Sequence, residues 1–470
     1  MKRAKRLYVL LGVLAVVCIA AFAVVKHEEQ QEEIRNSGET VLEIDPETVD
    51  SLSWEYEAED LAFHRDGTWQ YDADAAFPVS EEKIQELLEP FRALEAAFVI
   101  EEVTDYSQYG LDDPVCTIRL SAGETDYEIK LGDYSAMDAQ RYLSTGDGNV
   151  YLVEDDPLDY YYAITIRDLI ANDETPAFGR VTGIQFEGAD SYQVVYQAYL
   201  EESPYTDCSE DVYFRQEGED LKPLDTTLVE GYLSGIEHLT LDNYVTYQAG
   251  TEDLSQYGLD DPELTVTVTY TPEEDEEGES QTFTLHISRS PEERAAAEND
   301  TASEEDEEEE ITAYARVGDS EIVYQITGES YEALMAAGYD DLRHKEALTA
   351  DFTQVTGLDI TLEGTVYNLT SEGSGEDKTF RFGGEEVDVQ DLRSALEGLK
   401  AESFTQEEPT QKEEIALTVY LDHAAHPSVQ IQLYRYDGEN CLAVIDGEPV
   451  SLIPRSAVVD LIEAVNAIVL

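Results

Sequence analysis

The sequence is poor in positive charge. Its 470 residues include 28 lysines and arginines against 105 aspartates and glutamates, which gives a formal net charge of −77. Five of the cations lie within the first 26 residues, where no acid occurs, so only 23 remain in the rest of the chain. Nucleic acids and anionic lipid surfaces are bound by clustered lysine and arginine. The composition therefore excludes a nucleic-acid-binding protein.

Cysteine is also scarce, with four residues in the chain. Cys18 lies in an apolar N-terminal run, and Cys116, Cys208 and Cys441 are far apart in the sequence. Such spacing fits neither a disulfide framework nor a zinc knuckle. We expect buried or incidental thiols, with one long-range disulfide as the alternative.

The common catalytic motifs are missing. The sequence contains no G-x-S-x-G elbow, no phosphate-binding glycine loop and no H-E-x-x-H helix. Of the seven histidines, His423 and His426 form the one close pair, and without a third ligand nearby we expect surface histidines rather than a metal site. Carboxylates are so abundant that no pair singles out a glycosidase. The sequence predicts no catalytic residue, no cofactor and no metal.

One long apolar run stands near the N-terminus. Leu7 to Val25 contains no charged residue, and 19 helical residues span about 28 Å, close to the hydrocarbon thickness of a bilayer. Basic residues precede this run and glutamates follow it, so we expect the N-terminus in the cytoplasm and the remainder outside. A cleaved signal sequence is the alternative, because Ala21 and Ala23 form a small-x-small pattern.

The rest of the chain has the composition of a folded protein, because hydrophobic residues make up 42% of the sequence and 30 tyrosines are present. Three segments share the pattern V-x-x-(L/I)-x-apolar, which alternates as a half-buried strand does: 49–54, 181–186 and 355–360. Each is followed by an amphipathic segment that predicts a helix, at 79–88, 227–233 and 389–396. Ser80 is placed to cap the first of these helices. The pattern indicates three related modules.

An octapeptide, S-Q-Y-G-L-D-D-P, occurs twice without change, at 107–114 and 255–262, and each copy precedes an alternating strand. We interpret it as a structural corner in which glycine takes a positive φ, tyrosine and leucine fill the core, and proline extends the residue before it. Calcium binding by the aspartates is the alternative, but two adjacent carboxylates supply too few ligands. The predicted corner residues are Tyr109, Gly110, Leu111, Asp112, Asp113, Pro114, Tyr257, Gly258, Leu259, Asp260, Asp261 and Pro262.

These patterns predict an α+β fold made of tandem modules, each an antiparallel sheet with one or two amphipathic helices, after a single N-terminal transmembrane helix. The second module is expected to carry an acidic disordered insertion at about 272–310, which ends in the run Ser303–Glu310. The third lacks the octapeptide and is expected to be a divergent or truncated copy. The predicted parts are a basic tip and anchor (1–26), a polar linker (27–40) and three modules (41–178, 179–352 and 353–470).

The predicted anchor, the repeated Tyr-Gly-Leu-Asp-Asp-Pro corner and the V-x-x-(L/I) strands together resemble the bacterial domain-of-unknown-function 4340 (DUF4340) family, over most of residues 40–352. The resemblance implies a membrane-anchored envelope protein, and some members of the family look associated with ABC-2-type transporter or gliding-motility gene clusters. It carries over no catalytic residue.

We therefore expect a non-enzymatic extracytoplasmic interaction or scaffold protein, held in the bacterial cell membrane by one helix. Its expected partner is an envelope protein or an ABC-type transporter. The alternative is a cell-surface glycan-binding or hydrolytic module, because tyrosine-rich stretches such as 160–162 and 434–436 could stack on sugars.

Overall fold

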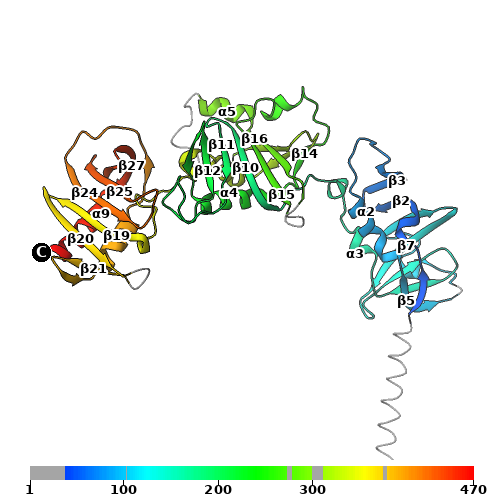
Figure 1. The fold of residues 1–470 in the computed structure, drawn as a ribbon. Coiled ribbons are helices and arrows are strands. Elements are labelled where there is room, and N and C mark those ends of the chain that lie inside the picture. The colour runs from blue at the N-terminus through cyan, green and yellow to red at the C-terminus, as the bar shows by residue number, and fades with distance from the viewer. Residues whose placement is uncertain (1–37, 102, 273–277, 299–310, 374–377) are drawn as a thin grey trace, which may run out of the picture. The chain divides into compact units, whose positions relative to one another are not determined.

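The computed structural model describes residues 38–101, 103–272, 278–298, 311–373 and 378–470. These residues belong to two compact units, Met1–Asn172 and Asp173–Leu470. The predicted anchor, Leu7 to Val25, lies outside the described residues. Within the described ranges, no helix is long and apolar enough to cross a membrane. Mostly antiparallel sheets with a few helices make up both units, so the α+β class is confirmed (Figure 1).

The first unit is built on one antiparallel sheet of nine strands, and helices with short 3-10 turns connect them. Across the sheet the strands are β1 (Glu39–Leu42), β5 (Leu94–Ile100), β9 (Val150–Val153), β8 (Gln140–Ser144), β7 (Thr125–Ser135), β6 (Cys116–Ala122), β2 (Val49–Tyr56), β3 (Glu59–Asp66) and β4 (Thr68–Tyr71). The helical elements are η1 (Pro46–Thr48), α2 (Glu81–Leu88), η2 (Glu89–Phe91), η3 (Ser107–Tyr109), α3 (Leu158–Tyr161) and η4 (Ile166–Leu169).

The core of this unit follows from its sequence pattern. In β2 the apolar side chains alternate toward one face, and Trp54 on that face stacks on Phe63 with ring centroids 5.6 Å apart. Helix α2 begins after Ser80, whose hydroxyl accepts a hydrogen bond from the Lys83 backbone N–H, as predicted. The Tyr161 hydroxyl donates to the Leu87 carbonyl at 2.6 Å, which joins α3 to α2. The two helices thereby complete the core.

The second unit begins with another nine-stranded antiparallel sheet. Across it the strands are β13 (Asp220–Pro223), β12 (Tyr213–Glu217), β11 (Tyr192–Tyr196), β10 (Phe178–Gly188), β15 (Leu264–Pro272), β16 (Gln281–Arg289), β17 (Ala313–Val317), β18 (Val323–Ile326) and β14 (Tyr244–Thr246). Its helical elements are α4 (Thr226–Glu237), η5 (Leu254–Tyr257), α5 (Pro291–Glu298), α6 (Gly328–Met335) and α7 (Tyr339–Leu342). The Tyr232 hydroxyl of α4 donates to the Leu334 carbonyl of α6 at 3.0 Å, so these two helices pack together.

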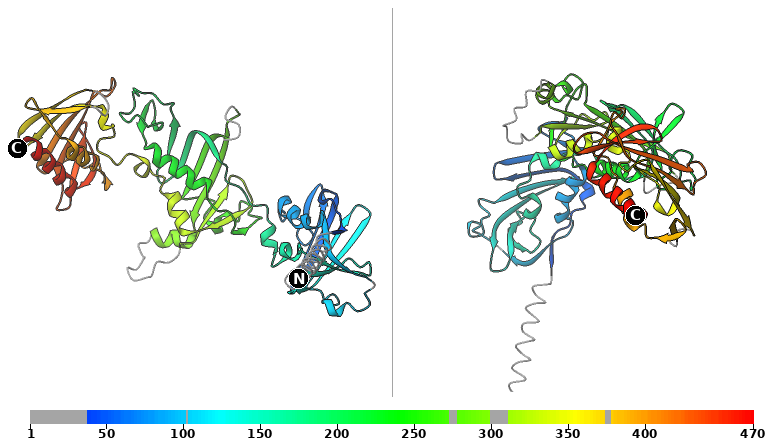
Figure 2. Two further views of the ribbon diagram at one scale, coloured as in Figure 1. Left: turned by 90° about the horizontal axis from the view of Figure 1, so that it is seen from below. Right: turned by 90° about the vertical axis from the view of Figure 1, so that its left-hand side faces the viewer.

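The same unit ends with a third nine-stranded antiparallel sheet. Across it the strands are β22 (Glu385–Val387), β21 (Thr379–Phe382), β20 (Thr365–Glu372), β19 (Val355–Leu362), β24 (Glu413–Leu421), β25 (Ser428–Arg435), β26 (Asn440–Ile445), β27 (Glu448–Pro454) and β23 (Ser403–Phe404). Its helical elements are η7 (Phe352–Gln354), α8 (Gln390–Glu397) and α9 (Arg455–Val469). Figure 2 shows α9, in red, against the strands of this sheet, and its buried residues Val458, Leu461 and Val465 join the core.

The three sheets share one connectivity over eight strands. The order β4-β3-β2-β6-β7-β8-β9-β5 corresponds to β12-β11-β10-β15-β16-β17-β18-β14 and to β21-β20-β19-β24-β25-β26-β27-β23. The ninth strand is β1 at one edge of the first sheet, and β13 or β22 at the opposite edge of the others. Of the two alternatives for the third module, this complete strand order favours a divergent copy over a truncated one.

The stretch at 272–310, expected as a disordered insertion, needs correction. Residues 281–289 form β16, which pairs with both β15 and β17 inside the sheet, and 291–298 form helix α5. The period-two alternation of Phe283, Leu285 and Ile287 explains the strand, because these side chains are buried. The acidic composition around β16 hid this pattern. The run Ser303–Glu310 lies outside the described residues.

Candidate functional site

The first octapeptide forms a turn that packs on strand β7. Ser107–Tyr109 make the 3-10 turn η3, and Gly110 ends it with φ of +70°, in the left-handed region that the sequence analysis expected. A Cβ atom at Gly110 would lie 2.9 Å from the backbone nitrogen of Asp133. Leu111 is buried in the core. Glycine is therefore required here by both backbone conformation and space.

The second octapeptide repeats this geometry on the equivalent strand, β16. Turn η5 ends at Gly258, whose φ is +72°, and a Cβ atom there would lie 2.9 Å from the carbonyl oxygen of Arg289. Leu259 is buried, as Leu111 is in the first copy. Tyr257 is half-buried and packs against the small core cluster that contains Leu259, and its ring meets that of Tyr314 edge to face with centroids 5.1 Å apart.

The tyrosine of the first copy is placed in the same way, since Tyr109 is half-buried and its ring centroid lies 5.0 Å from that of Tyr142 on β8. In both copies the proline precedes the next strand by two residues: Pro114 leads into β6 and Pro262 into β15. The octapeptide thus fixes a corner between a helical turn and a strand.

The paired aspartates of the octapeptides point to solvent. Asp112, Asp113, Asp260 and Asp261 are all exposed, and none belongs to a group of three metal-ligating side chains among the residues that the structure describes. Nothing in the two corners therefore favours the calcium alternative.

A buried arginine, Arg141, binds the backbone of β7, the strand on which the first corner packs. The guanidinium of Arg141 donates to the carbonyl oxygen of Gly132 at 2.7 Å and to a carboxylate oxygen of Asp156 at 2.5 Å. Both side chains are about nine-tenths buried. Burial of an ion pair is tolerated because each charge is hydrogen bonded within the site. This pair therefore fixes the strand on which the octapeptide turn rests.

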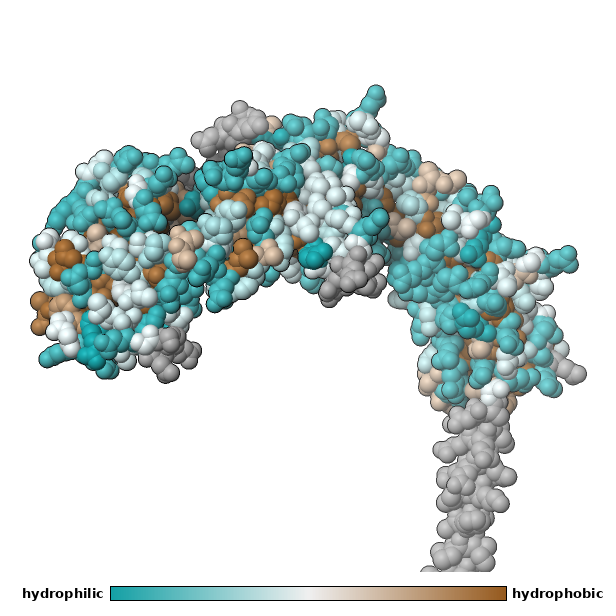
Figure 3. Space-filling model, viewed as in Figure 1, coloured by the Kyte–Doolittle hydropathy of each residue, from teal (hydrophilic) through white to brown (hydrophobic). Residues whose placement is uncertain are grey.

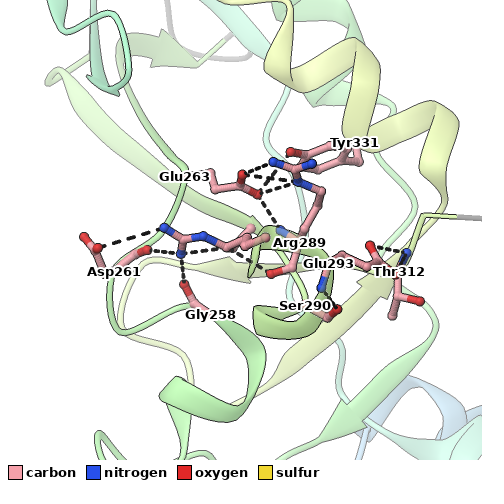
Figure 4. A network of polar contacts seen from close by, with 10 residues as sticks. Gly258, Asp261, Glu263, Arg289, Ser290, Glu293, Thr312 and Tyr331 are labelled. Carbon is pink, nitrogen blue, oxygen red and sulfur yellow. Dashed lines mark hydrogen bonds and ion pairs between the residues drawn. The ribbon is translucent and has the colours of Figure 1, made fainter. Parts of the chain in front are cut away.

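Two arginines hold the second corner by hydrogen bonds (Figure 4). Arg294 donates to the Asp261 carbonyl at 2.6 Å, and Arg289 pairs with the Glu263 carboxylate at 2.6 Å. The Tyr331 hydroxyl also donates to Glu263, at 3.0 Å. Burial acts to raise the pKa of Glu263, but the hydrogen bonds from Arg289 outweigh it and hold that pKa below its ordinary value. Glu263 is therefore a structural carboxylate that is ionised at neutral pH.

A shallow hollow of about 520 Å³ lies beside this network and is lined by Glu187, Asp261, Glu263, Arg294 and Met335, among others. Its one lining cation, Arg294, already donates to the backbone of the corner. We therefore do not assign a ligand to this hollow.

The described cysteines are free thiols. Cys116 and Cys441 are buried and Cys208 is half-buried, as one of our two alternatives expected. Burial raises the pKa of Cys116 and Cys208 to about 12 and that of Cys441 to about 11. Because the thiolate is the nucleophile, none of the three is activated for catalysis at neutral pH.

Of the pair His423 and His426, both expected at the surface, His423 is buried and His426 is partly exposed. Nδ1 of His423 accepts a hydrogen bond from the His426 backbone N–H at 3.0 Å. The segment Asp422-His423-Ala424-Ala425-His426-Pro427 connects β24 to β25, and the two imidazole rings lie 5.1 Å apart between centroids. The pair serves to close this connection.

A different histidine gathers metal-ligating groups, and we name the set of His344, Asp211, Asp225, Glu346 and Cys208 the histidine cluster. Two groups of three within it have ligand atoms mutually within 4.8 Å, one with Cys208 and Asp211 and one with Asp225 and Glu346. Burial acts to lower the pKa of His344, but the hydrogen bond to Asp211 and the other carboxylates raise it above its ordinary value. The surroundings favour a positive charge on this ring, from a proton or a metal ion.

Sequence reasoning missed the histidine cluster because its members are far apart in the chain. His344 lies 133 residues after Asp211, and no motif spacing covers such a distance. The one local signal is Asp207-Cys208-Ser209-Glu210-Asp211, which looks like any other acidic segment of this protein. The fold brings these residues together because α7 returns the chain to the start of α4, where the Asp225 backbone N–H donates to the Leu342 carbonyl at 2.9 Å.

Comparison with known proteins adds a family but no activity. The family model described as "Domain of unknown function (DUF4340)" matches residues 69–195 and 216–418, which is more than half of the chain and includes both octapeptides. No curated protein and no solved structure matches.

Proposed function

The chain belongs to the DUF4340 family, and on that premise we propose that it is a non-enzymatic interaction or scaffold protein of the cell envelope. Its predicted membrane helix at Leu7 to Val25 would hold the modules outside the cytoplasm. An ABC-type transporter or another envelope protein would be the partner.

One observation carries the proposal: in both copies of the octapeptide, the glycine and the leucine serve the fold, and the aspartates form no metal-ligating group among the described residues. In both octapeptides the glycine has a positive φ, the leucine is buried and the aspartates face solvent without a third ligand among the described residues. Repetition of a catalytic motif would instead place reactive groups around a cavity. The three sheets share one connectivity, so the chain repeats one scaffold three times, as expected of a protein that presents surface to a partner.

The surface offers apolar contact points within a strongly acidic background. Hydrophilic residues cover most of the face seen in Figure 3, and apolar residues are scattered among them. At the β7–β8 hairpin, Met137 in the connecting loop is 94% exposed and Tyr134, near the end of β7, is 50% exposed. Methionine and tyrosine are typical of protein interfaces, because the first adapts its shape and the second offers both apolar area and a hydroxyl. We name Tyr134 to Met137 the hairpin tip.

The test is a crosslinking pull-down from intact cells that express the tagged full chain. We expect recovery of one membrane-embedded envelope or transporter protein, and a loss of that protein when Tyr134→Asp and Met137→Asp are combined. Val366→Asp is the matched control, since Val366 is also exposed but lies on β20.

Recovery of bulk surface proteins alone, equal for the wild type and the hairpin-tip variant, would contradict the proposal. Recovery of glycan fragments instead of a protein would support the alternative of a glycan-binding module.

A further inference from the structure

We propose that the histidine cluster binds one divalent transition-metal ion of the zinc class, through His344 Nδ1 and one carboxylate oxygen each from Asp225 and Glu346. The site goes beyond the scaffold function and does not depend on it. Its role would be structural, because the ion would join the segment after α7 to Asp225, the residue that caps the start of α4.

The geometry of the three ligand atoms suits a small metal ion. Nδ1 of His344 lies 3.8 Å from Oδ2 of Asp225 and 3.9 Å from Oε2 of Glu346. Around a tetrahedral zinc ion with bonds of about 2.1 Å, two ligand atoms lie about 3.4 Å apart. A contraction of about half an ångström, within the reach of side-chain rotation, would close the site.

In each of the two carboxylates, one oxygen makes a structural contact and the other faces the imidazole ring of His344. Oδ1 of Asp225 caps α4 by accepting from the backbone N–H of Thr227 at 2.9 Å, while its Oδ2 faces His344. Oε1 of Glu346 pairs with Lys400 at 2.9 Å, while its Oε2 faces the same nitrogen. The two structural contacts hold both ligands in position before any ion binds.

A buried carboxylate on the opposite side of the ring sets its orientation. Nε2 of His344 donates to Oδ1 of Asp211 at 2.8 Å, and the Asp211 side chain is 1% exposed. Its second oxygen accepts from the Thr206 hydroxyl at 2.6 Å. With a proton on Nε2, Nδ1 is left with a lone pair, and this nitrogen lies 3.8 Å from Asp225 and 3.9 Å from Glu346. Metal-binding histidines are oriented by an outer carboxylate in the same way.

The other group of ligands, Cys208 with Asp211 and Nε2 of His344, is the weaker choice. The direct hydrogen bond between Nε2 and Asp211 fills the space that an ion would need. We therefore place the ion on the Nδ1 side.

The ligand set selects the kind of ion. One imidazole nitrogen and two carboxylate oxygens suit Zn²⁺ and its spectroscopic substitute Co²⁺, with water at the remaining position. Calcium and magnesium prefer sites made wholly of oxygen and usually need more ligands. An excess of Mg²⁺ will therefore occupy the acidic surface without displacing zinc from this site.

The experiment titrates the metal-free full chain, in detergent and with excess Mg²⁺, with Zn²⁺ by calorimetry and with Co²⁺ by visible absorption. We expect one tight Zn²⁺ per chain and Co²⁺ bands typical of a low coordination number. His344→Asn and Glu346→Gln should each abolish the tight site. His426→Asn, a partly buried histidine without a carboxylate partner among the described contacts, is the matched control and should bind as the wild type does.

The supporting carboxylate gives a graded readout. Asp211→Asn should weaken Zn²⁺ binding by about 10- to 100-fold, since it perturbs the orientation of the ring but removes no ligand. Glu346 is partly exposed, so its variant keeps the test valid if His344→Asn does not fold. Equal Zn²⁺ binding by wild type and Glu346→Gln, or a Co²⁺ spectrum that remains that of the hexa-aquo ion, would overturn the proposal.

Discussion

Replacing Gly110 by alanine should destabilise the first module far more than the same change at Gly123. Both glycines have positive φ, +70° and +61°. A Cβ at Gly110 would meet the backbone nitrogen of Asp133 at 2.9 Å, whereas nothing lies within 4 Å of a Cβ at Gly123. The pair therefore separates the cost of the backbone conformation from the cost of the contact.

The expected magnitudes follow from these two terms. A left-handed conformation costs an alanine about 1–2 kcal/mol at either position. Forcing a methyl group against a packed backbone adds about 1–3 kcal/mol at Gly110 alone. We expect Gly123→Ala to lower the free energy of unfolding by about 1–2 kcal/mol and Gly110→Ala by about 2–5 kcal/mol.

The sequence supplies a probe for this module alone. Its two tryptophans, Trp54 and Trp69, are both buried in the first module, so tryptophan fluorescence during urea unfolding of the full chain reports that module. Gly258→Ala, the same change in the second module, should leave this transition unchanged. Equal unfolding midpoints for Gly110→Ala and Gly123→Ala would refute the structural interpretation of the octapeptide.

Three further outcomes are expected. Arg141→Met leaves the Asp156 carboxylate buried without its partner and should cost about 3–5 kcal/mol in the tryptophan-monitored unfolding; an unchanged midpoint would contradict the role of the pair. Because the pKa of Glu263 is lowered in the folded state, its stabilisation is present above about pH 4.5 and is lost as the pH falls through the folded pKa. The protection of β15 amides, measured by hydrogen exchange and corrected for the intrinsic pH dependence of exchange, should therefore fall on acidification in the wild type but less in Glu263→Gln. Parallel curves would count against this assignment. Cys116 and Cys441 should resist iodoacetamide in the folded chain and react once urea unfolds it, as mass spectrometry would measure; rapid labelling of the folded chain would show that these thiols are accessible.

Local patterns in the sequence were sufficient for the parts of the fold that repeat. The segments predicted as opening strands lie within β2, β10 and β19, and the predicted helices correspond to α2, α4 and α8. Period-two and helical alternation are properties of neighbouring residues, so one sequence can show them. The octapeptide was informative for the same reason, since the conformation of Gly110 depends on the turn that contains it.

The sequence did not reveal features that depend on residues far apart in the chain, or on patterns hidden by an acidic composition. Strand β16 alternates correctly, but its acidic flanks suggested an insertion. The burial of His423 depends on how the turn between β24 and β25 folds back, which composition does not indicate. His344 meets Asp211 across 133 residues, and such a contact exists only once the sheet and α7 have formed. The candidate metal site was therefore beyond the reach of motif analysis.

The central claim is that this protein acts by contacting a partner in the envelope. Its most direct test is a photo-crosslinking amino acid at position 137, the most exposed residue of the hairpin tip, in the full chain in living cells. We predict one discrete adduct with a membrane-embedded envelope or transporter protein, absent when the same amino acid replaces Val366. A diffuse set of adducts that is the same from both positions would contradict the claim.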